Sequence, residues 1–166
     1  MTDILISNSY YLARDQVAKH VAYFYPPLGP LYIAAYLRQV GPWHIEVFDS
    51  TFALDESEYE RVVHRLRPRA VGIQSFITTR RAAQRMIQIA KSAGAYVVLG
   101  GPDPSACYQD YLRWGADFVV IGEGELTAAE LMFCLTGRID MSPRSIHGLA
   151  FWDNSDLVVT PRCVNL

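Results

Sequence analysis

The sequence predicts an α/β fold in which a doubly wound, parallel, five-stranded sheet is followed by a C-terminal β-hairpin. Three observations lead to this prediction. Short runs of apolar residues, typical of strands buried on both faces, recur between residues 4 and 121. Helical patterns separate these runs, and most connections between them are short. Repeated β-α units of this kind form a parallel sheet with right-handed crossovers, as in flavodoxin-like and Rossmann-like folds.

Five segments fit such strands. Each is rich in Val, Ile, Leu, Phe or Ala and ends at a polar or turn-forming stretch. The predicted strands span residues 4–7, 45–49, 70–75, 96–100 and 118–121.

Two helices are predicted from amphipathic periodicity. In "DESEYERVVHRL", Asp55 and Glu58 have the spacing of a capping box. In "TTRRAAQRMIQIAKSAG", Gly94 is placed to end the helix. The apolar stripes are Tyr59, Val62, Val63 and Leu66 in the first helix, and Ala83, Met86, Ile87 and Ala90 in the second.

Three further helices are predicted from their boundaries. One begins near Pro30 and ends before Gly41. Another opens with Asp103 as N-cap and Pro104 in the first turn, and it ends at Gly115. The last follows the fifth strand and is closed by a glycine. The positions that mark these last two helices are Tyr111 and Leu112, and Ala128, Leu131, Met132, Leu135 and Gly137.

The C-terminal part has a different pattern. "IHGLAFWDNSDLVVTP" contains two β-rich runs around Asp153, Asn154 and Ser155, which predict a hairpin either added to the end of the sheet or folded over it. We therefore divide the chain into an α/β domain, residues 1–137, and a hairpin and linker, residues 138–166. Because the sequence stops at "PRCVNL" with no terminal helix, we expect a fragment of a longer protein.

Composition excludes several classes of protein. The 166 residues suit one domain, and 51% hydrophobic with 19% charged residues excludes disorder. A net charge of -2 offers no basic surface for nucleic acid. No apolar run approaches the roughly 20 residues that span a membrane, and "MTDILIS" lacks the features of a signal peptide, so we expect a cytoplasmic protein. Cys107, Cys134 and Cys163 form neither a disulfide pattern nor a CxxC site, and we interpret them as incidental thiols.

The stretch "AYVVLGGPDPSA" points to a ligand site. In open α/β sheets, ligands bind beyond the carboxyl ends of the strands, where Gly100 and Gly101 are placed. Glycines let a ligand lie against the main chain, and Ser75, Thr78 and Thr79 add hydroxyl groups to the same edge. The alternative is a tight turn that only needs a positive φ at one glycine.

Several common ligands do not match this edge. No glycine occurs between Ser7 and Gly29, which disfavours a dinucleotide, and no Walker phosphate loop is present. A phospho-acceptor domain needs an acidic pair at the end of the first strand, where Ser7 and Asn8 are found. Flavodoxin-like mononucleotide binding stays open as an alternative.

Three longer segments carry a family resemblance. "PPLGPLYIAAYLRQVGPWHIEVFDS", "VGIQSFITTRRAAQRMIQIAKSAGAYVVLGGPDPSA" and "ADFVVIGEGELTAAEL" together resemble the N-terminal cobalamin-binding domain of B12-dependent radical SAM proteins. The nearest resemblance is to the anaerobic magnesium-protoporphyrin IX monomethyl ester oxidative cyclases, and it runs over about residues 1–137. "TPRCVNL" is similar to the linker before the radical SAM barrel in such proteins. The resemblance therefore implies a B12-binding-domain type of sheet, with a [4Fe-4S] cluster and S-adenosylmethionine held by a partner domain absent from this chain.

The resemblance also implies where cobalamin binds. The corrin ring would lie over the loops that follow the first, second and fifth strands, and the nucleotide tail would enter between the first and third strands. The residues expected at this site are Pro27, Leu28, Phe48, Asp49, Ser75, Phe76, Ile77, Thr78, Gly100, Gly101, Pro102, Gly122 and Glu123.

One departure concerns the cobalt ligand. Corrinoid methyltransferases and mutases of this fold carry DxHxxG after the first strand, and this sequence has no such motif. His20 lies in the corresponding segment but lacks the spacing, and His44, His64 and His147 belong to a strand entrance, a helix and the tail. We therefore expect cobalamin to bind without a histidine ligand from the protein.

We expect no catalytic residue within the chain. Glu123 and Glu125 resemble a carboxylate pair, but their place at a helix start equally suits stabilisation of the helix dipole. The chain then acts as a cofactor-binding module of a radical SAM cyclase or methyltransferase, and a flavodoxin-like or non-catalytic interaction domain is the alternative. Several aromatic residues of the long first loop could line a cavity or pack against the missing barrel: Tyr10, Tyr11, Tyr23, Phe24 and Tyr25.

Overall fold

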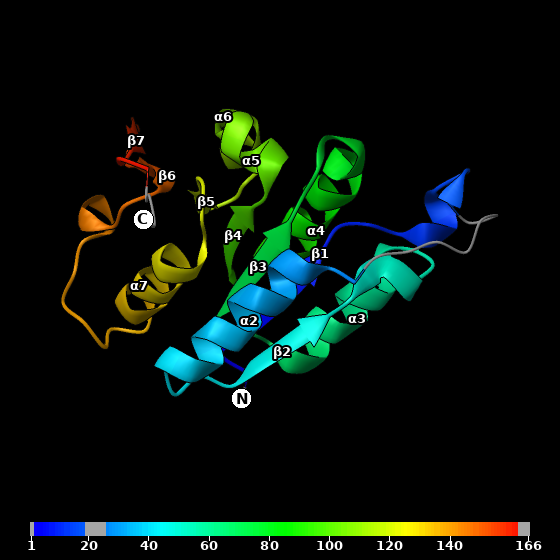
Figure 1. Ribbon diagram of the computed structural model, residues 1–166, viewed down its shortest axis with the longest axis horizontal. Helices are drawn as coiled ribbons and strands as arrows, with labels where there is room; N and C mark the ends of the chain where they lie inside the picture. Colours follow the sequence, from blue (N-terminus) through cyan, green and yellow to red (C-terminus); the bar gives the residue numbers. More distant parts are fainter. Residues whose placement is uncertain (1, 19–25, 163–166) are drawn as a thin grey trace.

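A seven-stranded sheet organises the computed structural model, which describes residues 2–18 and 26–162 (Figure 1). The strand order is β2-β1-β3-β4-β5-β6-β7. The first five strands are parallel, as predicted. The strands are β1 Ile4–Asn8, β2 Ile45–Phe48, β3 Ala70–Gln74, β4 Tyr96–Gly100, β5 Phe118–Val120, β6 Leu149–Asp153 and β7 Asp156–Val159.

The strand order reverses at β1. This strand pairs with β2 on one side and with β3 on the other, with Ile4 opposite Ile45 in the first pair and opposite Ala70 in the second. Reversal of strand order creates a crevice outside the carboxyl ends of the strands, where ligands bind in this class of fold.

The C-terminal hairpin continues the same sheet. Strand β6 pairs antiparallel with β5, with Phe118 opposite Phe151, and β7 pairs antiparallel with β6. Of the two arrangements that the sequence left open, the hairpin is therefore added to the sheet edge and is not folded over it.

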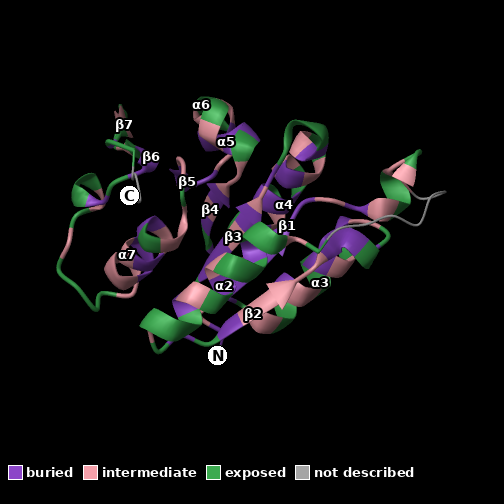
Figure 2. Cartoon of the chain, in the orientation of Figure 1, coloured by how far each residue is buried: buried purple, intermediate pink, exposed green. Residues whose placement is uncertain are grey.

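Helices cover both faces of the sheet (Figures 1 and 2). Helices α2 and α7 pack against each other and cover one face. Helices α3, α4 and α6 cover the other, where Tyr59, Met86 and Tyr111 are fully buried. The helices are α2 Leu28–Val40, α3 Glu56–Leu66, α4 Arg80–Ser92, α5 Pro102–Ala106, α6 Tyr108–Arg113 and α7 Glu125–Leu135. Short 3-10 turns are η1 Leu12–Arg14, η2 Ser50–Phe52, η3 Ile77–Thr79 and η4 Pro143–Ser145.

The predicted helix signals of α3 and α4 are confirmed. Asp55 caps α3 by accepting a hydrogen bond from the Ser57 backbone N–H at 2.9 Å. Glu58 reaches back to the Leu54 N–H at 3.1 Å, which resembles a capping box displaced by one residue. On α4 the stripe is completely buried at Ala83, Met86, Ile87 and Ala90.

The predicted N-cap at Asp103 is wrong. Gly101 is the N-cap of α5, and Pro102 occupies its first position. The Asp103 carboxylate instead accepts hydrogen bonds from Arg80 Nε at 2.6 Å and the Tyr111 hydroxyl at 2.5 Å. The predicted single helix is also divided at Cys107, whose backbone leaves the helical region and separates α5 from α6.

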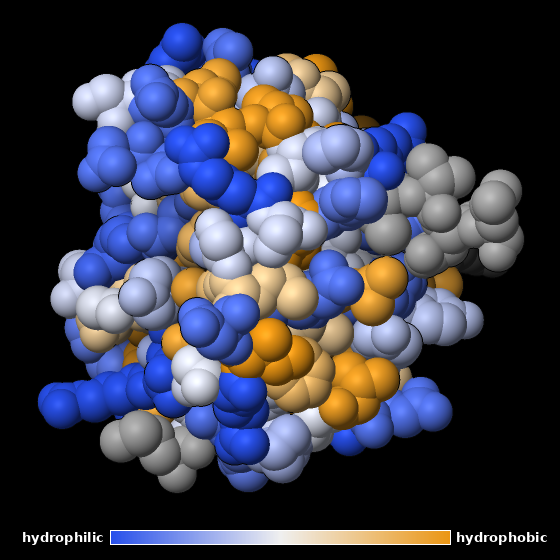
Figure 3. Space-filling view, turned by 90° about the vertical axis from the view of Figure 1, so that its left-hand side faces the viewer, coloured by the Kyte–Doolittle hydropathy of each residue, from blue (hydrophilic) through white to orange (hydrophobic). Residues whose placement is uncertain are grey.

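The side of the molecule that carries β7 exposes hydrophobic residues among hydrophilic ones (Figure 3). On the hairpin and α7 these include Leu126, Trp152 and Val159, each at least 40% exposed. No helix among the described residues is long and apolar enough to cross a membrane.

Candidate functional site

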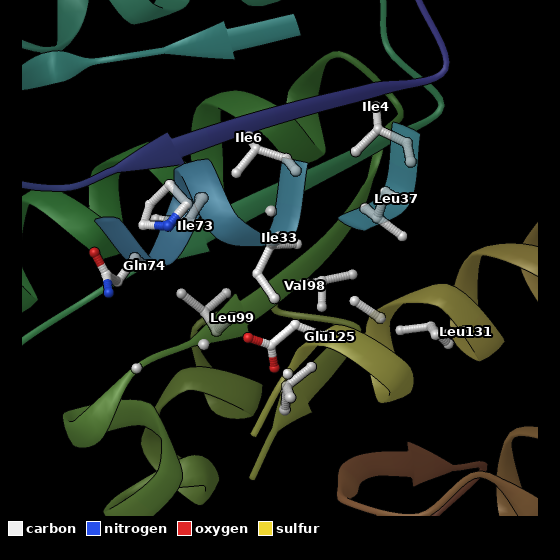
Figure 4. A pocket seen from close by; sticks show the side chains of 18 of the residues that line it. Ile4, Ile6, Ile33, Leu37, Ile73, Gln74, Val98, Leu99, Glu125 and Leu131 are labelled. Atoms are coloured by element: carbon white, nitrogen blue, oxygen red, sulfur yellow. The ribbon is translucent and has the colours of Figure 1, made fainter. Parts of the chain in front are cut away.

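A pocket of about 250 Å³ lies between the sheet and helices α2 and α7 (Figure 4). Its floor is formed by β1, β3, β4 and the end of β5, and its walls by the two helices. Its lining is mostly apolar. The lining residues with large apolar side chains include Ile4, Ile6, Ile33, Leu37, Val98, Val120, Leu131 and Met132.

Gly72 leaves a gap in the floor of the pocket because glycine has no side chain. This glycine lies in the middle of β3, opposite Ile6 on β1. A Cβ on Gly72 would meet only Ile6 Cγ1, at the ordinary contact distance of 3.7 Å. Glycine weakens a strand interior and often marks a close approach by a ligand. Packing within the described residues does not require this glycine, and its effect is to leave space in the pocket.

Gly100 and Gly101 have different reasons to be glycine. A Cβ on Gly100 would meet nothing within 4 Å. Gly101 has φ +108°, and a Cβ there would lie 2.6 Å from the Ser75 carbonyl oxygen. Gly101 is therefore demanded by the turn itself, as the alternative interpretation of this stretch held. No contact or positive φ requires a glycine at position 100, and the absence of a side chain there leaves space in the pocket.

Polar side chains gather at the mouth of the pocket. Gln74 lies at the carboxyl end of β3, and Figure 4 shows Glu125 on α7 with its carboxylate turned toward the same end of the pocket, while Ile4 and Leu37 lie at the other end. Glu123 also lines this opening. The pocket is thus polar at its mouth and apolar in its depth.

The structure places the residues predicted from the sequence in three groups. Gly100, Gly101, Gly122 and Glu123 line the pocket. A second group lies at the carboxyl edge of the sheet, and all of its members except the half-buried Pro27 are exposed. Pro27 is the N-cap of α2, Leu28 and Ile77 are 58% and 74% exposed, and the other members of this group are Phe76, Thr78 and Pro102.

The third group is turned away from the pocket. Phe48 packs near Tyr59 on the opposite face of the sheet, with ring centroids 5.8 Å apart. Asp49 caps η2 by accepting from the Thr51 N–H at 3.0 Å. Ser75 is buried, and its hydroxyl lies 3.0 Å from the Tyr111 hydroxyl. These three residues support the site from behind and do not line it.

A polar network holds the strand ends behind the site. The Ser9 hydroxyl donates to Thr79 Oγ1 at 2.7 Å and lies 2.9 Å from the Gln74 carbonyl oxygen. The Thr79 hydroxyl contacts the Ser75 hydroxyl, which in turn contacts the Tyr111 hydroxyl. Tyr111 donates a hydrogen bond to the Asp103 carboxylate. Because these residues come from the segments that follow β1 and β3, from η3, and from α5 and α6, the network fixes the relative positions of the loops that form the mouth.

The charges of this network are set by burial and hydrogen bonding. Burial raises the pKa of the Asp103 carboxyl, but hydrogen bonds from Arg80 and Tyr111 outweigh burial and leave the pKa below its ordinary value. Burial and the hydrogen bond to Asp103 raise the pKa of the Tyr111 hydroxyl. At neutral pH the network therefore holds an ionised aspartate, a neutral tyrosine and a cationic Arg80.

Sequence reasoning missed several pocket residues. Gly72 carries the clearest signal, because a glycine inside the buried run "AVGIQ" is unusual for a central strand. Gln74 lies two residues after Gly72, on the same face of β3. Ile33 and Met132 lie on helices, and only the tertiary structure shows that their side chains face the pocket.

The remaining candidates lie elsewhere. His44, His64 and His147 are exposed and do not line the pocket. Tyr11 is buried in the core beneath α3, so it neither lines the pocket nor is exposed to another domain. Its neighbour Tyr10 donates a hydrogen bond to Asp15. His20, Tyr23, Phe24, Tyr25 and Cys163 lie outside the described residues.

No metal-ligating cluster of His, Cys, Asp and Glu occurs within residues 2–18 and 26–162. Cys107 and Cys134 are free thiols that are neither fully buried nor exposed.

Together, the strand order and the pocket at the carboxyl edge define a ligand-binding domain of the doubly wound α/β class. Residues 15–132 match the family model described as the B12 binding domain. The chain belongs to this family.

Two curated relatives and one solved structure are similar to this chain. An anaerobic magnesium-protoporphyrin IX monomethyl ester cyclase of Rubrivivax gelatinosus is 27% identical over 97% of this chain. An uncharacterised methyltransferase of Pyrococcus horikoshii is 30% identical over 78% of it. The cobalamin-dependent S-adenosylmethionine radical enzyme OxsB, solved with aqua-cobalamin and S-adenosylmethionine bound, superposes on 99% of this chain with a TM-score of 0.83 at 14% identity, which shows a shared fold.

This chain spans only a part of each of these proteins. It covers 30% of the cyclase, 28% of the methyltransferase and 23% of OxsB. The family and the fold are therefore established for the binding domain, and the activity of a whole protein is a separate question.

Proposed function

We propose that this chain is the cobalamin-binding module of a B12-dependent radical SAM enzyme. The observation that carries the proposal is the space left over β3 and β4 by Gly72 and Gly100 in an otherwise apolar pocket. Neither glycine is demanded by its neighbours, so the space is available to a ligand. Membership of the B12 binding domain family supports cobalamin as that ligand.

The shape of the site fits cobalamin in two parts. A pocket of about 250 Å³ is smaller than the roughly 300 to 1,000 Å³ of sites that enclose a drug-sized ligand, so it suits a flat base and not a whole corrinoid. The macrocycle would remain outside, against the exposed apolar side chains of Leu28, Phe76 and Ile77. Burying these side chains under a planar ring would be favourable.

The residues of this chain would bind and orient the cofactor. The apolar depth would take the nucleotide base, and Gln74 and Glu125 at the mouth would face the sugar hydroxyls. The network from Ser9 to Asp103 would keep these loops in place. The cobalt would supply methyl-transfer or redox chemistry when bound, and we propose that no histidine of this chain coordinates it.

The reaction belongs to the rest of the parent protein. We propose that a radical SAM domain follows the hairpin and holds the [4Fe-4S] cluster and S-adenosylmethionine, and that the enzyme is cytoplasmic. The names of the two curated relatives support a cyclase acting in tetrapyrrole biosynthesis and a methyltransferase as candidate activities. We propose that residues 1–137 bind the cofactor and that residues 138–166 lead to the catalytic domain.

Titration with cobalamin tests the proposal. The 166-residue chain is mixed with aqua-cobalamin, and binding is followed by calorimetry and by the visible spectrum. We expect saturable binding without a spectral sign of nitrogen coordination by the protein. A parallel titration with flavin mononucleotide tests the flavodoxin-like alternative, and binding of the flavin but not of cobalamin would overturn the proposal.

A further inference from the structure

A base bound deep in the pocket would find no side chain there that donates a hydrogen bond. The side chains that close it belong to Ile4, Leu37, Leu131 and Met132, which carry no hydrogen-bond donor. Leu131 is 1% exposed and Met132 4% exposed, so water reaches neither from the other side.

The backbone of the floor is also fully engaged. Strand β1 pairs with both β2 and β3, and β3 pairs with both β1 and β4. A strand with a partner on each side has no N–H or C=O group left for a ligand. A polar atom on the buried edge of a base would therefore lose its hydrogen bonds to water without replacement.

Polar lining groups occur only toward the mouth. Gln74 and Glu125 lie toward the open end of the pocket, apart from Leu37 and Ile4 at the other end (Figure 4). The part of a ligand near the mouth can be polar, but the part that enters the depth must be apolar.

We infer that this pocket selects cobamides whose lower base is a benzimidazole or another apolar ring over cobamides whose lower base is a purine. The inference rests on the proposed function, because it takes a corrinoid to be the ligand. Adenine carries ring nitrogens and an exocyclic amine around its edge, and an unpaired buried polar group is costly. Dimethylbenzimidazole presents carbon atoms and methyl groups there.

Four corrinoids with the same upper ligand test the inference on the 166-residue chain. They are cobalamin, a phenolyl cobamide, an adeninyl cobamide and cobinamide, which has no nucleotide. Calorimetric titration should show that the adeninyl cobamide binds roughly 10-fold or more weakly than cobalamin. The phenolyl cobamide should bind more tightly than the adeninyl form, because its ring is apolar.

The outcomes separate the inference from the proposed function. Equal affinity for cobalamin and the adeninyl cobamide would overturn the inference and leave the proposed function intact. Equal affinity for cobalamin and cobinamide would overturn it too, since the base would then contribute nothing. If no corrinoid bound, both would fail.

A matched pair of variants at Met132 adds a second readout. Met132→Gln places an amide in the depth at nearly unchanged volume, and Met132→Leu keeps the site apolar. We expect the glutamine variant to lower the ratio of the affinity for cobalamin to the affinity for the adeninyl cobamide. The leucine variant should leave this ratio unchanged. Thermal unfolding of both variants establishes that they are folded, and an unchanged preference in a folded Met132→Gln protein would count against the inference.

Discussion

Gly72 on β3 lies directly opposite Ile6 on β1, and the Cβ that Gly72 lacks would come no closer than 3.7 Å to any atom of the surrounding protein. An alanine could occupy this position without a clash. Packing of the described residues therefore does not explain why this position is a glycine.

Filling this space should weaken cobalamin binding while sparing the fold. In the series Gly72→Ala and Gly72→Val, we expect cobalamin affinity to fall stepwise, by roughly 10-fold or more for valine. Stability should be unchanged or higher by about 0.5 to 1 kcal/mol, because glycine is unfavourable inside a strand. Calorimetric titration and thermal unfolding measure the two effects. A valine variant that binds cobalamin normally would show that the pocket is not the site.

Gly100 and Gly101 should respond differently to the same substitution. Gly101→Ala forces a side chain onto a backbone with φ +108° and against the Ser75 carbonyl, so we expect a loss of about 1 to 3 kcal/mol. Gly100→Ala should leave the stability within about 0.5 kcal/mol, because its Cβ would meet nothing. Urea unfolding of the two variants measures these changes in stability. Equal losses of stability would contradict the conclusion that the turn requires Gly101 but not Gly100. A bulkier Gly100→Val should weaken cobalamin binding.

The Asp103 carboxylate should make stability depend on acid pH. Its folded-state pKa lies below the ordinary value, so its contribution is present above about pH 4 and is lost as the pH falls through the lower, folded-state pKa. Asp103→Asn should cost about 1 to 3 kcal/mol at pH 7, since Arg80 and Tyr111 lose an ionised partner. Urea unfolding between about pH 3 and 7 should show this difference shrinking in acid. A difference that stays constant over the range would rule out this carboxylate as its source.

The exposed apolar edge should contribute to binding and not to folding. Ile77 is 74% exposed in η3, which follows β3 at the carboxyl edge of the sheet, so Ile77→Ser should change stability by less than about 0.5 kcal/mol. Cobalamin affinity should fall several-fold, because the ring would lose apolar contact area. Val40→Ser is the matched control, since Val40 is also exposed but lies at the far end of α2. Equal effects of the two variants on affinity would show that η3 is not part of the binding surface.

Much of this architecture could be predicted from the order of residues alone. The parallel strands, the capped helix α3 and the buried stripe of α4 follow from local rules, because the period of apolar residues and the cap at Asp55 act within a few residues. Gly100 and Gly101, singled out at the carboxyl edge, line the pocket. Family resemblance led to the same domain.

The tertiary structure alone decided which of these residues form the pocket. Whether Ser75 and Phe48 face the pocket or the opposite core depends on which helices cover each face of the sheet. Asp103 does not cap a helix because Arg80 and Tyr111 reach it from distant parts of the chain. The two adjacent glycines look alike in the sequence. The positive φ of Gly101 and the position of the Ser75 carbonyl distinguish the glycine that the turn requires from the one that leaves room in the pocket, because steric space is a property of neighbours brought together by folding.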